Sequence, residues 1–488
     1  MSLQQSQKLR TSLERFSDIL SDQDIEEILA IQDQPLSPGI RLNQLKVDPQ
    51  EEIERLAEFY NWKVQPIPFC EQGWTILEAV ESPGTTIEHR MGQYYLQDAA
   101  SMVPVSIFEF RESHPLILDM AASPGGKTTH LIDRSGDHGF IIANDSSKGR
   151  IPALRSVLTN WGGINRIITQ YPGELFGEWF PETFDMILLD APCSMENLRP
   201  TPSHPLRETT ADERLRLQER QVQLLMSALS ALKVGGQLVY ATCSLAPEED
   251  EAVFQKVIDA FPGSFMIQDA ALKFPYQAPG LTQFGGEKFH PDLAHTLRLW
   301  PHLKGMSGFY CGLLVKTKPT TFRQSEPPAR DLEKTDLSPL SAIIQKDVID
   351  VILGQYGFQL DVLLNQYHLA LHKRFDQLFL IPETYLKQFP TLPFDQIGMQ
   401  LGQWQNGQFR PSHEFVSRFG HHFTGGKIVL ENDEAVVQWI AGRDIRHPIT
   451  DMPAQGQYLL VSDVHNRNLG IGKLLPKRLR NMLPRQSI

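Results

Sequence analysis

The stretch FDMILLDAPCS, residues 184–194, decides how the centre of this chain folds. Four apolar residues lead into Asp190, and the Ala-Pro-Cys that follows ends the strand pattern at Cys193. Such a run is typical of a buried parallel strand, which delivers its last side chains to the carboxyl edge of a sheet. Ligands bind at that edge. We therefore predict a parallel sheet with a functional site where this strand ends.

A second stretch ends in the same way. Residues 236–251, GQLVYATCSLAPEEDE, place Cys243 at the end of another strand, before an acidic segment that starts a helix. A lone cysteine is usually an inert core residue. Two cysteines at matching strand ends, one in Asp-Ala-Pro-Cys and one in Thr-Cys-Ser, favour a functional pair over two independent core residues.

Composition limits the class of protein. A chain of 488 residues suggests about two to four domains, and 41% hydrophobic with 21% charged residues is ordinary for a globular protein. No apolar run approaches the roughly 18 residues of a membrane helix, and the N-terminus lacks the apolar core of a signal peptide. The net charge of −12 argues against a surface coated with nucleic acid but leaves room for local basic patches.

The four cysteines are Cys70, Cys193, Cys243 and Cys311. They form no close C-x-x-C pair and no Cys/His cluster, so the sequence predicts neither a disulfide scaffold nor a metal site. A reducing cytoplasm fits this usage, and we expect a cytoplasmic protein without a membrane segment.

The first hundred residues predict helices followed by a small α+β domain. Residues 1–35 have helical spacing, residues 40–47 alternate as a strand, and residues 51–60 read as an amphipathic helix. The stretch 91–110 reads as a connector that enters a helix, and we expect that helix to pack against the next domain. We take residues 1–100 as an N-terminal RNA-binding domain.

Residues 101–320 change to an α/β pattern. The expected strands cover residues 115–120, 139–145, 166–171, 184–191 and 236–244, and the expected helices cover 128–134, 146–162 and 213–233. This alternation predicts a doubly wound, mainly parallel sheet.

The turn after the first of these strands is the natural cofactor site. It reads Ala-Ala-Ser-Pro-Gly-Gly-Lys at residues 121–127 and differs from both the dinucleotide fingerprint and the Walker motif. Its glycines let the backbone approach a ligand at a helix N-terminus, although a tight turn needing glycine explains them equally well. Asp145, at the end of the second strand, is placed to accept hydrogen bonds from ribose hydroxyls, which favours a nucleoside cofactor. Asp119 closes the first strand and orients the turn.

Four segments carry a family resemblance. Residues 119–131 (DMAASPGGKTTHL), 143–150 (ANDSSKGR), 188–194 (LLDAPCS) and 240–251 (YATCSLAPEEDE) resemble successive motifs of the Sun/Nop-type RNA (cytosine-5) methyltransferases, which use S-adenosylmethionine. Residues 41–47, 92–105 and 298–316 extend the likeness. The resemblance implies a Rossmann-like class I methyltransferase sheet, an RNA substrate, and S-adenosylmethionine as cofactor, with no metal.

The resemblance also implies roles for single residues. Cys243 would add to C6 of cytosine, and Cys193 would assist release of the product. Asp190 would donate a proton to N3 of the ring, and Lys127 would contact the same ring. This chemistry needs a thiolate, because C5 of cytosine is too weakly nucleophilic to take a methyl group unaided. The cofactor would be bound by Ala121, Ala122, Ser123, Pro124, Gly125, Gly126, Lys127, Asp145, Arg150 and Asp190.

Two positions depart from the family pattern. The family commonly continues the DAPCS motif with Gly-Glu-Gly, whereas this chain has Met195-Glu196-Asn197 followed by a Pro-rich segment. We expect a loop of different shape over the base. Pro172 stands where an acid usually contacts the cofactor's adenine, so no adenine contact is carried over.

The C-terminal third predicts a linker at 321–340, an intermediate domain at 341–400 and a β-rich domain at 401–488. The last of these resembles the PUA-like tail of bacterial small-subunit rRNA enzymes of the same family. It ends in a basic cluster, namely Arg467, Lys473, Lys477, Arg478, Arg480 and Arg485. Binding to RNA phosphates explains this cluster better than a solvated tail does.

The resemblance implies that the protein methylates C5 of a specific cytidine in 16S rRNA or the small ribosomal subunit, and we expect it to act as a monomer. The alternatives are a tRNA cytosine-5 methyltransferase and a non-catalytic RNA-binding assembly factor that keeps the methyltransferase fold. A small-molecule methyltransferase would need neither the two strand-end cysteines nor the basic appendage.

Overall fold

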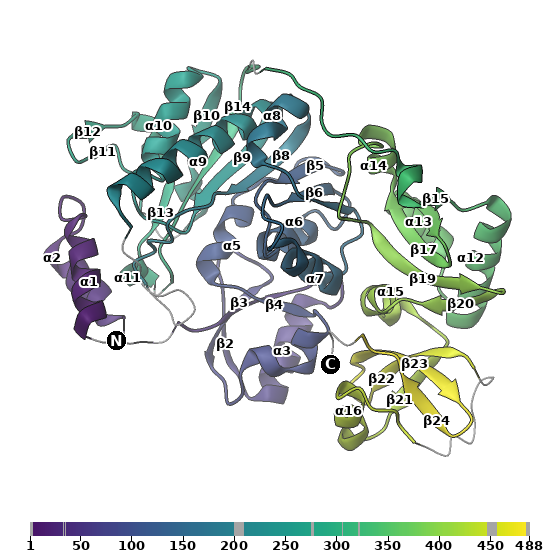
Figure 1. Ribbon diagram of the computed structural model, residues 1–488. Coiled ribbons are helices and arrows are strands. Elements are labelled where there is room, and N and C mark those ends of the chain that lie inside the picture. The colour runs from purple at the N-terminus through teal and green to yellow at the C-terminus, as the bar shows by residue number, and fades with distance from the viewer. Residues whose placement is uncertain are drawn as a thin grey trace.

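The structure is a computed structural model that describes residues 3–32, 34, 36–199, 209–274, 278–304, 306–320, 323–446 and 456–484. A nine-stranded sheet in the order β10-β14-β9-β8-β5-β6-β7-β18, with β13 paired to β14, forms its centre (Figure 1). The strands are β5 (Leu116–Asp119), β6 (Phe140–Asn144), β7 (Arg166–Thr169), β8 (Phe184–Asp190), β9 (Leu232–Thr242), β10 (Phe265–Gln268), β13 (Leu297–Leu299), β14 (Phe309–Lys316) and β18 (Gln396–Ile397).

The five strands expected from the sequence are all present and parallel. β5 lies between β6 and β8, β7 extends the sheet beyond β6, and β9 lies beside β8 with Asp190 opposite Ala241. The predicted doubly wound sheet is therefore confirmed, and the two cysteine-bearing strands are direct neighbours. The sequence analysis did not identify β10, β13 and β14. β14 runs antiparallel between β9 and β10 and completes the sheet.

Helices cover both faces of this sheet. Successive residues of β5 alternate between two cores: Leu116 and Leu118 pack with α8, α9 and α10, whereas Ile117 packs with α5, α6 and α7. This period of two is what a strand buried on both faces requires. The helices are α5 (Ala99–Ser106), α6 (Gly126–Arg134), α7 (Ile151–Trp161), α8 (Phe176–Trp179), α9 (Ala211–Ala231) and α10 (Glu251–Ala260). As expected, α5 packs against the central sheet.

The N-terminal hundred residues divide into two parts that lie apart in Figure 1. The first is a helical hairpin of α1 (Leu3–Glu14) and α2 (Asp22–Ala30), which packs with Leu198, Leu245 and Trp300 of the central region. The second is an antiparallel sheet in the order β2-β3-β1-β4, covered by α3. Its elements are β1 (Gly39–Leu42), α3 (Pro49–Tyr60), β2 (Lys63–Pro66), β3 (Gly73–Glu78) and β4 (Tyr94–Leu96).

Two local expectations in this region need correction. The strand expected over residues 40–47 ends at Leu42, because the Asn43 side chain accepts from the Leu45 amide and turns the chain. The expected connector at 91–110 contains β4, which pairs with β1.

The C-terminal third contains two further sheets. A five-stranded sheet has the order β15-β16-β17-β19-β20, and a four-stranded sheet has the order β21-β22-β23-β24. The expected boundary at residue 400 falls inside β19 and is misplaced, because the change of sheet comes after β20. The elements are β15 (Ser338–Pro339), α12 (Ala342–Tyr356), α13 (Leu360–Gln366), β16 (Leu369–Arg374), β17 (Gln377–Pro382), α14 (Glu383–Gln388), β19 (Met399–Gln405), β20 (Gln408–Pro411), α15 (His413–Phe419), β21 (Lys427–Leu430), α16 (Asp433–Ile440), β22 (Tyr458–Asp463), β23 (Asn468–Leu475) and β24 (Arg478–Asn481).

This third is joined to the central sheet through buried contacts. β18 pairs with β7, and Arg166 of β7 forms a buried ion pair of 3.2 Å with Glu414 of α15. The segment expected as a separate intermediate domain thus supplies an edge strand to the central sheet.

Candidate functional site

The two strand-end cysteines meet. Cys193 follows β8, Cys243 follows β9, and their Sγ atoms lie 3.1 Å apart. Both are half-buried, whereas the other two cysteines, Cys70 and Cys311, are buried elsewhere. The hydrogen bond to Cys243, burial, and the charges of Cys243 and Glu249 raise the pKa of the Cys193 thiol well above its ordinary value. Cys193 is therefore held as a neutral thiol in the free protein.

Both thiols line a cavity of about 370 Å³ at the carboxyl edge of the sheet. Asp145, Arg150 and Asp190 line the same cavity. A second cavity of about 320 Å³ shares Ala121 and Asp190 with the first and contains Lys127. Every site residue expected from the sequence except Gly125 lines one of these two cavities, so the structure brings the expected set together.

The turn between β5 and α6 requires both of its glycines. Gly125 has φ +117°, and a Cβ there would lie 3.0 Å from the Val157 side chain. A Cβ on Gly126 would lie 2.7 Å from the ring of Tyr95. Arg41 of β1 is buried, donates to the carbonyl of Gly126 at 3.2 Å and pairs with Asp133 of α6. The N-terminal sheet thus contacts and stabilises the turn through Arg41.

Asp145 is buried at the cavity wall and organises the neighbouring backbone. Its carboxylate accepts from the amides of Ser147 at 2.9 Å and Ser123 at 3.2 Å. Arg150, expected to bind the cofactor, donates to the carbonyl of Ser123 and lies 3.5 Å from Asp145. Its guanidinium therefore braces the turn.

Asp119 supplies an unusual carboxyl group at the base of the turn. One of its oxygens accepts from Thr128 at 2.6 Å, and the other is buried without a partner among the described residues. Burial raises the pKa of Asp119 to about 7. An unpartnered carboxyl oxygen in a residue that lines the second cavity, together with Asp145 in the first, fits a polar nucleoside cofactor with hydroxyl and ammonium groups to donate.

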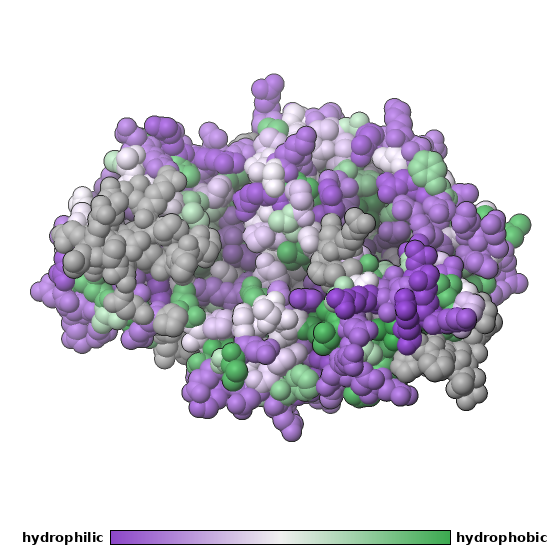
Figure 2. Space-filling model, turned by 60° about the horizontal axis from the view of Figure 1, so that its bottom comes forward, coloured by the Kyte–Doolittle hydropathy of each residue, from purple (hydrophilic) through white to green (hydrophobic). Residues whose placement is uncertain are grey.

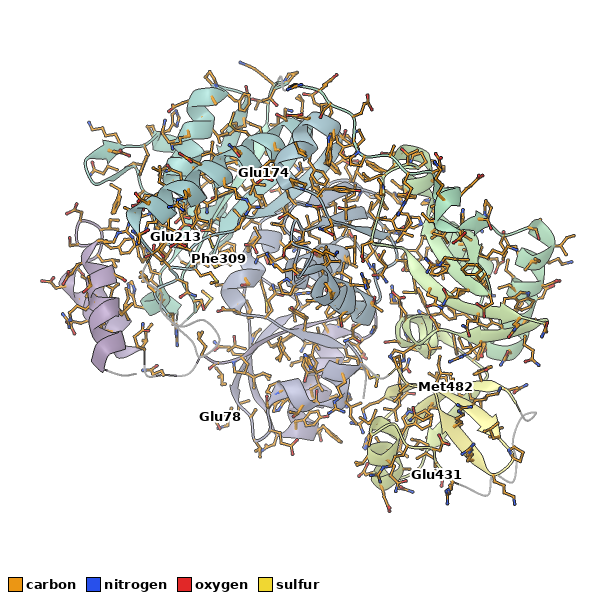
Figure 3. The ribbon with its side chains drawn as sticks, in the orientation of Figure 1. Glu78, Glu174, Glu213, Phe309, Glu431 and Met482 are labelled. Atoms are coloured by element: carbon orange, nitrogen blue, oxygen red, sulfur yellow. The ribbon has the colours of Figure 1, made fainter. Side chains whose placement is uncertain are left out.

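Lys127 and Asp190 form an ion pair of 2.7 Å at the junction of the two cavities. The Lys127 ammonium also lies 5.3 Å from the ring centre of Phe309, at the start of β14. Figure 3 places Phe309 at the lower edge of the sheet, beside α5. Burial alone would lower the pKa of Lys127, but the Asp190 carboxylate outweighs it and raises that pKa. Lys127 is thus charged and directed at Asp190.

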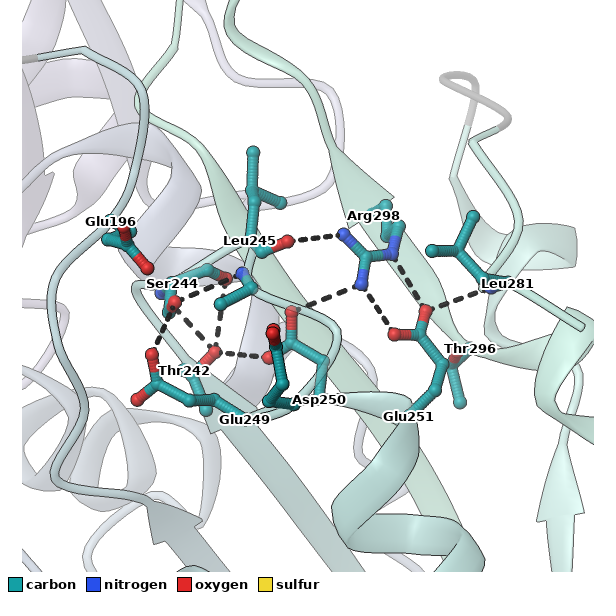
Figure 4. Close-up of polar contacts among 12 residues, drawn as sticks. Glu196, Thr242, Ser244, Leu245, Glu249, Asp250, Glu251, Leu281, Thr296 and Arg298 are labelled. Carbon is teal, nitrogen blue, oxygen red and sulfur yellow. Dashed lines mark hydrogen bonds and ion pairs between the residues drawn. The ribbon is translucent and has the colours of Figure 1, made fainter. Parts of the chain in front are cut away.

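The acidic segment after Cys243 is buried, which the sequence analysis did not foresee. Glu249, Asp250 and Glu251 are all fully buried, and Arg298 of β13 pairs with two of them, Asp250 at 3.3 Å and Glu251 (Figure 4). Burial raises the pKa of Asp250 well above its usual range, despite Arg298. A signal was available in the run of four adjacent acids, residues 248–251, that follows a buried strand.

The loop that departs from the family pattern is held by ion pairs. Glu196 is buried and lies 2.7 Å from Arg214 of α9 and 3.5 Å from Arg15, which follows α1. Met195 is exposed and has φ +63°. These ion pairs fix the base of the loop and connect the N-terminal hairpin to α9. The segment 200–208 lies outside the described residues.

The described part of the chain contains neither a candidate metal site nor a candidate membrane-spanning helix. No group of three or more His, Cys, Asp or Glu side chains there is arranged to hold a metal ion. None of the helices described is long and apolar enough to cross a membrane.

Comparisons with known proteins agree with this architecture. A family model described as 16S rRNA methyltransferase RsmB/F matches residues 107–315, and one described as the N-terminal domain of 16S rRNA methyltransferase RsmF matches residues 11–99. The ribosomal RNA small subunit methyltransferase F of Pectobacterium carotovorum subsp. carotovorum is 31% identical over 484 residues, which are 98% of this chain and 95% of the relative. The protein of the same name from Shewanella sediminis is 30% identical over 95% of this chain and 93% of its own.

Solved structures show the same fold. A methyltransferase homolog protein from Pyrococcus horikoshii is 30% identical, has a TM-score of 0.56, and covers 65% of this chain and 100% of its own. NSun6 from Pyrococcus horikoshii with SFG, at 21% identity and a TM-score of 0.52, covers 64% of this chain and 98% of its own, and supports the fold alone. The resemblance inferred from the sequence motifs is thereby confirmed, and this chain belongs to the family of ribosomal RNA small subunit methyltransferases F.

Proposed function

We propose that this protein is an S-adenosylmethionine-dependent RNA (cytosine-C5) methyltransferase that modifies a specific cytidine of 16S rRNA. The observation that carries the proposal is the pair of half-buried thiols, 3.1 Å apart, at the wall of the cavity that contains Asp145. Full-length relatives named ribosomal RNA small subunit methyltransferase F support the choice of substrate. Since that substrate is ribosomal RNA, we place the protein in the cytoplasm. We also propose that it acts as a monomer.

The cofactor would be held by the residues of the first cavity and the turn beside it. Asp145 would accept hydrogen bonds from the ribose hydroxyls, and the turn at residues 121–127 would enclose the amino-acid end. When bound, S-adenosylmethionine supplies an electrophilic methyl group. Arg150 contributes by fixing the carbonyl of Ser123. Gly173 lines the cavity and packs closely on Leu224, since a Cβ there would lie 2.7 Å from that side chain.

The two thiols divide the work on the base. The thiolate of Cys243 adds to C6 of cytosine, which makes C5 nucleophilic enough to be methylated. The C5 proton must then leave, so that the bond between C6 and Cys243 breaks and the aromatic ring is restored. Cys193, held close to Cys243, would pass its own proton to solvent and then, as the thiolate, accept the C5 proton, while the electrons of the C5–H bond restore the double bond and expel the Cys243 thiolate.

Lys127 and Asp190 would meet the polar edge of the ring. Adduct formation places negative charge on N3, and a proton from Asp190 would neutralise it. In the free protein Asp190 accepts a hydrogen bond from Lys127. We therefore infer that Lys127 shares its proton with Asp190 as the base enters and remains in contact with the ring.

The C-terminal region would hold the RNA, and we propose that the part of the chain after β20 forms a PUA-like RNA-binding unit. Its exposed cations are Lys427, Arg443, Arg446, Lys477, Arg478 and Arg480. Figure 2 shows a mostly hydrophilic face whose deepest purple side chains gather on the right. Arg467, first assigned to the basic cluster, is instead buried and paired with Asp463 at 2.6 Å, and Arg485 lies outside the described residues.

The experiment is bisulfite sequencing of 16S rRNA and tRNA from a strain that lacks the protein. We expect one 16S cytidine to lose its methyl group, with the tRNA pattern unchanged, and wild-type protein but not Cys243→Ala to restore it. Loss confined to tRNA would overturn the assignment to 16S rRNA. An unchanged pattern in both RNAs would favour a non-catalytic assembly factor.

A further inference from the structure

Glu249 contacts the loops that carry both thiols. Its carboxylate accepts four hydrogen bonds: from the amide of Ser194 at 2.9 Å, from the hydroxyl of Ser194, from the hydroxyl of Ser244 at 2.9 Å and from the side chain of Gln221 at 3.0 Å. Ser194 follows Cys193 and Ser244 follows Cys243 in the sequence. Figure 4 shows Glu249 beside Ser244. One fully buried side chain thus joins the two segments that deliver the reactive groups.

Glu249 is itself fixed to the core. Its amide donates to the carbonyl of Ala246 at 2.9 Å, and its carbonyl accepts from the hydroxyl of Tyr240, within β9, at 2.6 Å. Gln221 of α9 also donates to the carbonyl of Pro192 at 2.9 Å, so the same helix holds Glu249 and the residue before Cys193. The carboxylate is therefore a rigid reference point for both loops.

The neighbouring acid has a different task. Glu251 pairs with Arg298 and accepts from the amide of Leu281 at 2.8 Å, which fastens α10 to β13. It makes no hydrogen bond to either cysteine loop within the part of the chain that the structure describes. Arg298 is a cationic partner for both Asp250 and Glu251, whereas the hydrogen bonds to Glu249 come from neutral donors. Burying a carboxylate that only neutral donors contact costs free energy of folding. A contribution to stability therefore does not explain why Glu249 is buried here.

We propose that Glu249 is the positioning residue that sets the separation of the Cys193 and Cys243 thiols. By holding Ser194 and Ser244 on one carboxylate, it keeps the nucleophile and the release group in contact through a reaction in which they act in turn. The inference deepens the proposed function and rests on it only for the kinetic measurement. The charge of Glu249 has a second consequence, because it contributes to the raised pKa of Cys193 and so helps to keep that thiol neutral.

The test compares Glu249→Gln and Glu249→Asp with Glu251→Gln, a matched substitution two residues away. The first measurement needs neither RNA nor cofactor. Diamide oxidises Cys193 and Cys243 to a disulfide: the thiols lose two protons and two electrons, and the azo bond of the reagent is reduced to a hydrazine. Peptide mapping by mass spectrometry follows the linked pair. Wild type and Glu251→Gln should form the disulfide quickly. When rates are compared at equal thiolate fraction of Cys193, Glu249→Gln should form it about tenfold more slowly, as expected when a charge-assisted tether is lost.

The second measurement is the pH dependence of alkylation of Cys193, read peptide by peptide. Removing the negative charge in Glu249→Gln should move the curve to lower pH, whereas Glu249→Asp and Glu251→Gln should leave it in place. A purely structural role for Glu249 would not shift this curve.

The third measurement is turnover. A misplacement of reacting groups by about 1 Å can cost on the order of 100-fold in rate, so kcat should fall by about that factor in Glu249→Gln while KM for S-adenosylmethionine stays within about twofold. Glu249→Asp, which keeps the charge but is one methylene shorter, should recover part of kcat. Should Glu249→Gln fail to fold, the pair Ser194→Ala and Ser244→Ala removes the hydroxyl donors and leaves the carboxylate in place.

The proposal would be overturned if Glu249→Gln matched wild type in disulfide formation, in alkylation and in kcat. It would also be overturned if Glu249→Gln and Glu251→Gln lost activity equally and in proportion to their melting temperatures. If wild type methylates no cytidine but Glu249→Gln still slows disulfide formation, the proposed function fails and the positioning role stands.

Discussion

Cys193 and Cys243 are 50 residues apart in the chain, yet their Sγ atoms lie 3.1 Å apart. Each thiol follows one of two adjacent parallel strands, β8 and β9, whose register places Asp190 opposite Ala241. The fold thereby delivers two chemically identical groups to one point at the wall of the cavity that Asp145 lines. A reaction that needs a nucleophile and a separate release group explains why both are present.

Asp145 should dominate cofactor affinity. Asp145→Ala removes the acceptor proposed for the ribose hydroxyls and frees the amides of Ser123 and Ser147. Loss of hydrogen bonds to a charged group predicts a weakening of about 10- to 100-fold in Kd for S-adenosylmethionine, measured by isothermal titration calorimetry. Asp331→Ala, an exposed acid distant in sequence, serves as the control. Unchanged affinity in Asp145→Ala, with the fold intact by circular dichroism, would rule out the ribose contact.

Lys127 and Asp190 should behave as one unit. Each of Lys127→Met and Asp190→Asn should lower kcat by about 10²- to 10⁴-fold, the range of general acid–base groups. Because each side chain loses its partner when the other is replaced, the kcat of the double variant should be no lower than that of the less active single variant. Single-turnover kinetics on the four proteins gives the comparison. Multiplicative losses would show that the two groups act independently.

The C-terminal cations should contribute sequence-independent phosphate contacts. Replacing Lys477 and Arg480 by Ala should weaken RNA binding and reduce the slope of log K against log salt by about 0.7 per lost contact on single-stranded RNA. Arg478 is a poorer choice because it pairs with Asp444 at 3.1 Å. The control removes two exposed lysines elsewhere, Lys334 and Lys387. The same slope in both double variants would mean that the cluster is merely solvated.

Asp119 should make stability depend on pH. Its pKa is raised to about 7 in the folded protein and is about 4 in an unfolded chain. Between these values the folded state binds the extra proton, so stability falls as pH rises, by up to about 1.4 kcal/mol per pH unit from this group. Asp119→Asn removes this contribution, so the wild type should lose more stability than the variant between pH 4.5 and pH 7. Urea denaturation at several pH values provides the test, and parallel curves for the two proteins would contradict it.

The sequence predicted the parts of the site that depend on strand ends. Asp190, Cys193 and Cys243 terminate apolar runs, and parallel strands bring such ends to one edge, so their meeting followed from topology. The Gly125-Gly126 turn could also be predicted from the sequence, because its glycines precede a helix.

Long-range contacts were not predictable in the same way. The buried position of Glu249 depends on Ser194 and Gln221, which lie 55 and 28 residues away. The N-terminal hairpin packs near Leu245 rather than on the adjacent small sheet. Its helical periodicity shows which face is buried but not which part of the protein covers that face. Antiparallel β14 was missed because its apolar run does not show which strands it joins.

The measurement that tests the account most directly is covalent capture of RNA by the two cysteine variants. Wild type, Cys193→Ala and Cys243→Ala are each incubated with 16S rRNA and S-adenosylmethionine and run on denaturing gels. If Cys243 adds to C6 and Cys193 serves only release, Cys193→Ala alone should give a slowly migrating protein–RNA band, and Cys243→Ala should give neither band nor methylation. A band with Cys243→Ala instead would invert the two roles, and no band with any variant, while wild type turns over, would contradict the covalent mechanism.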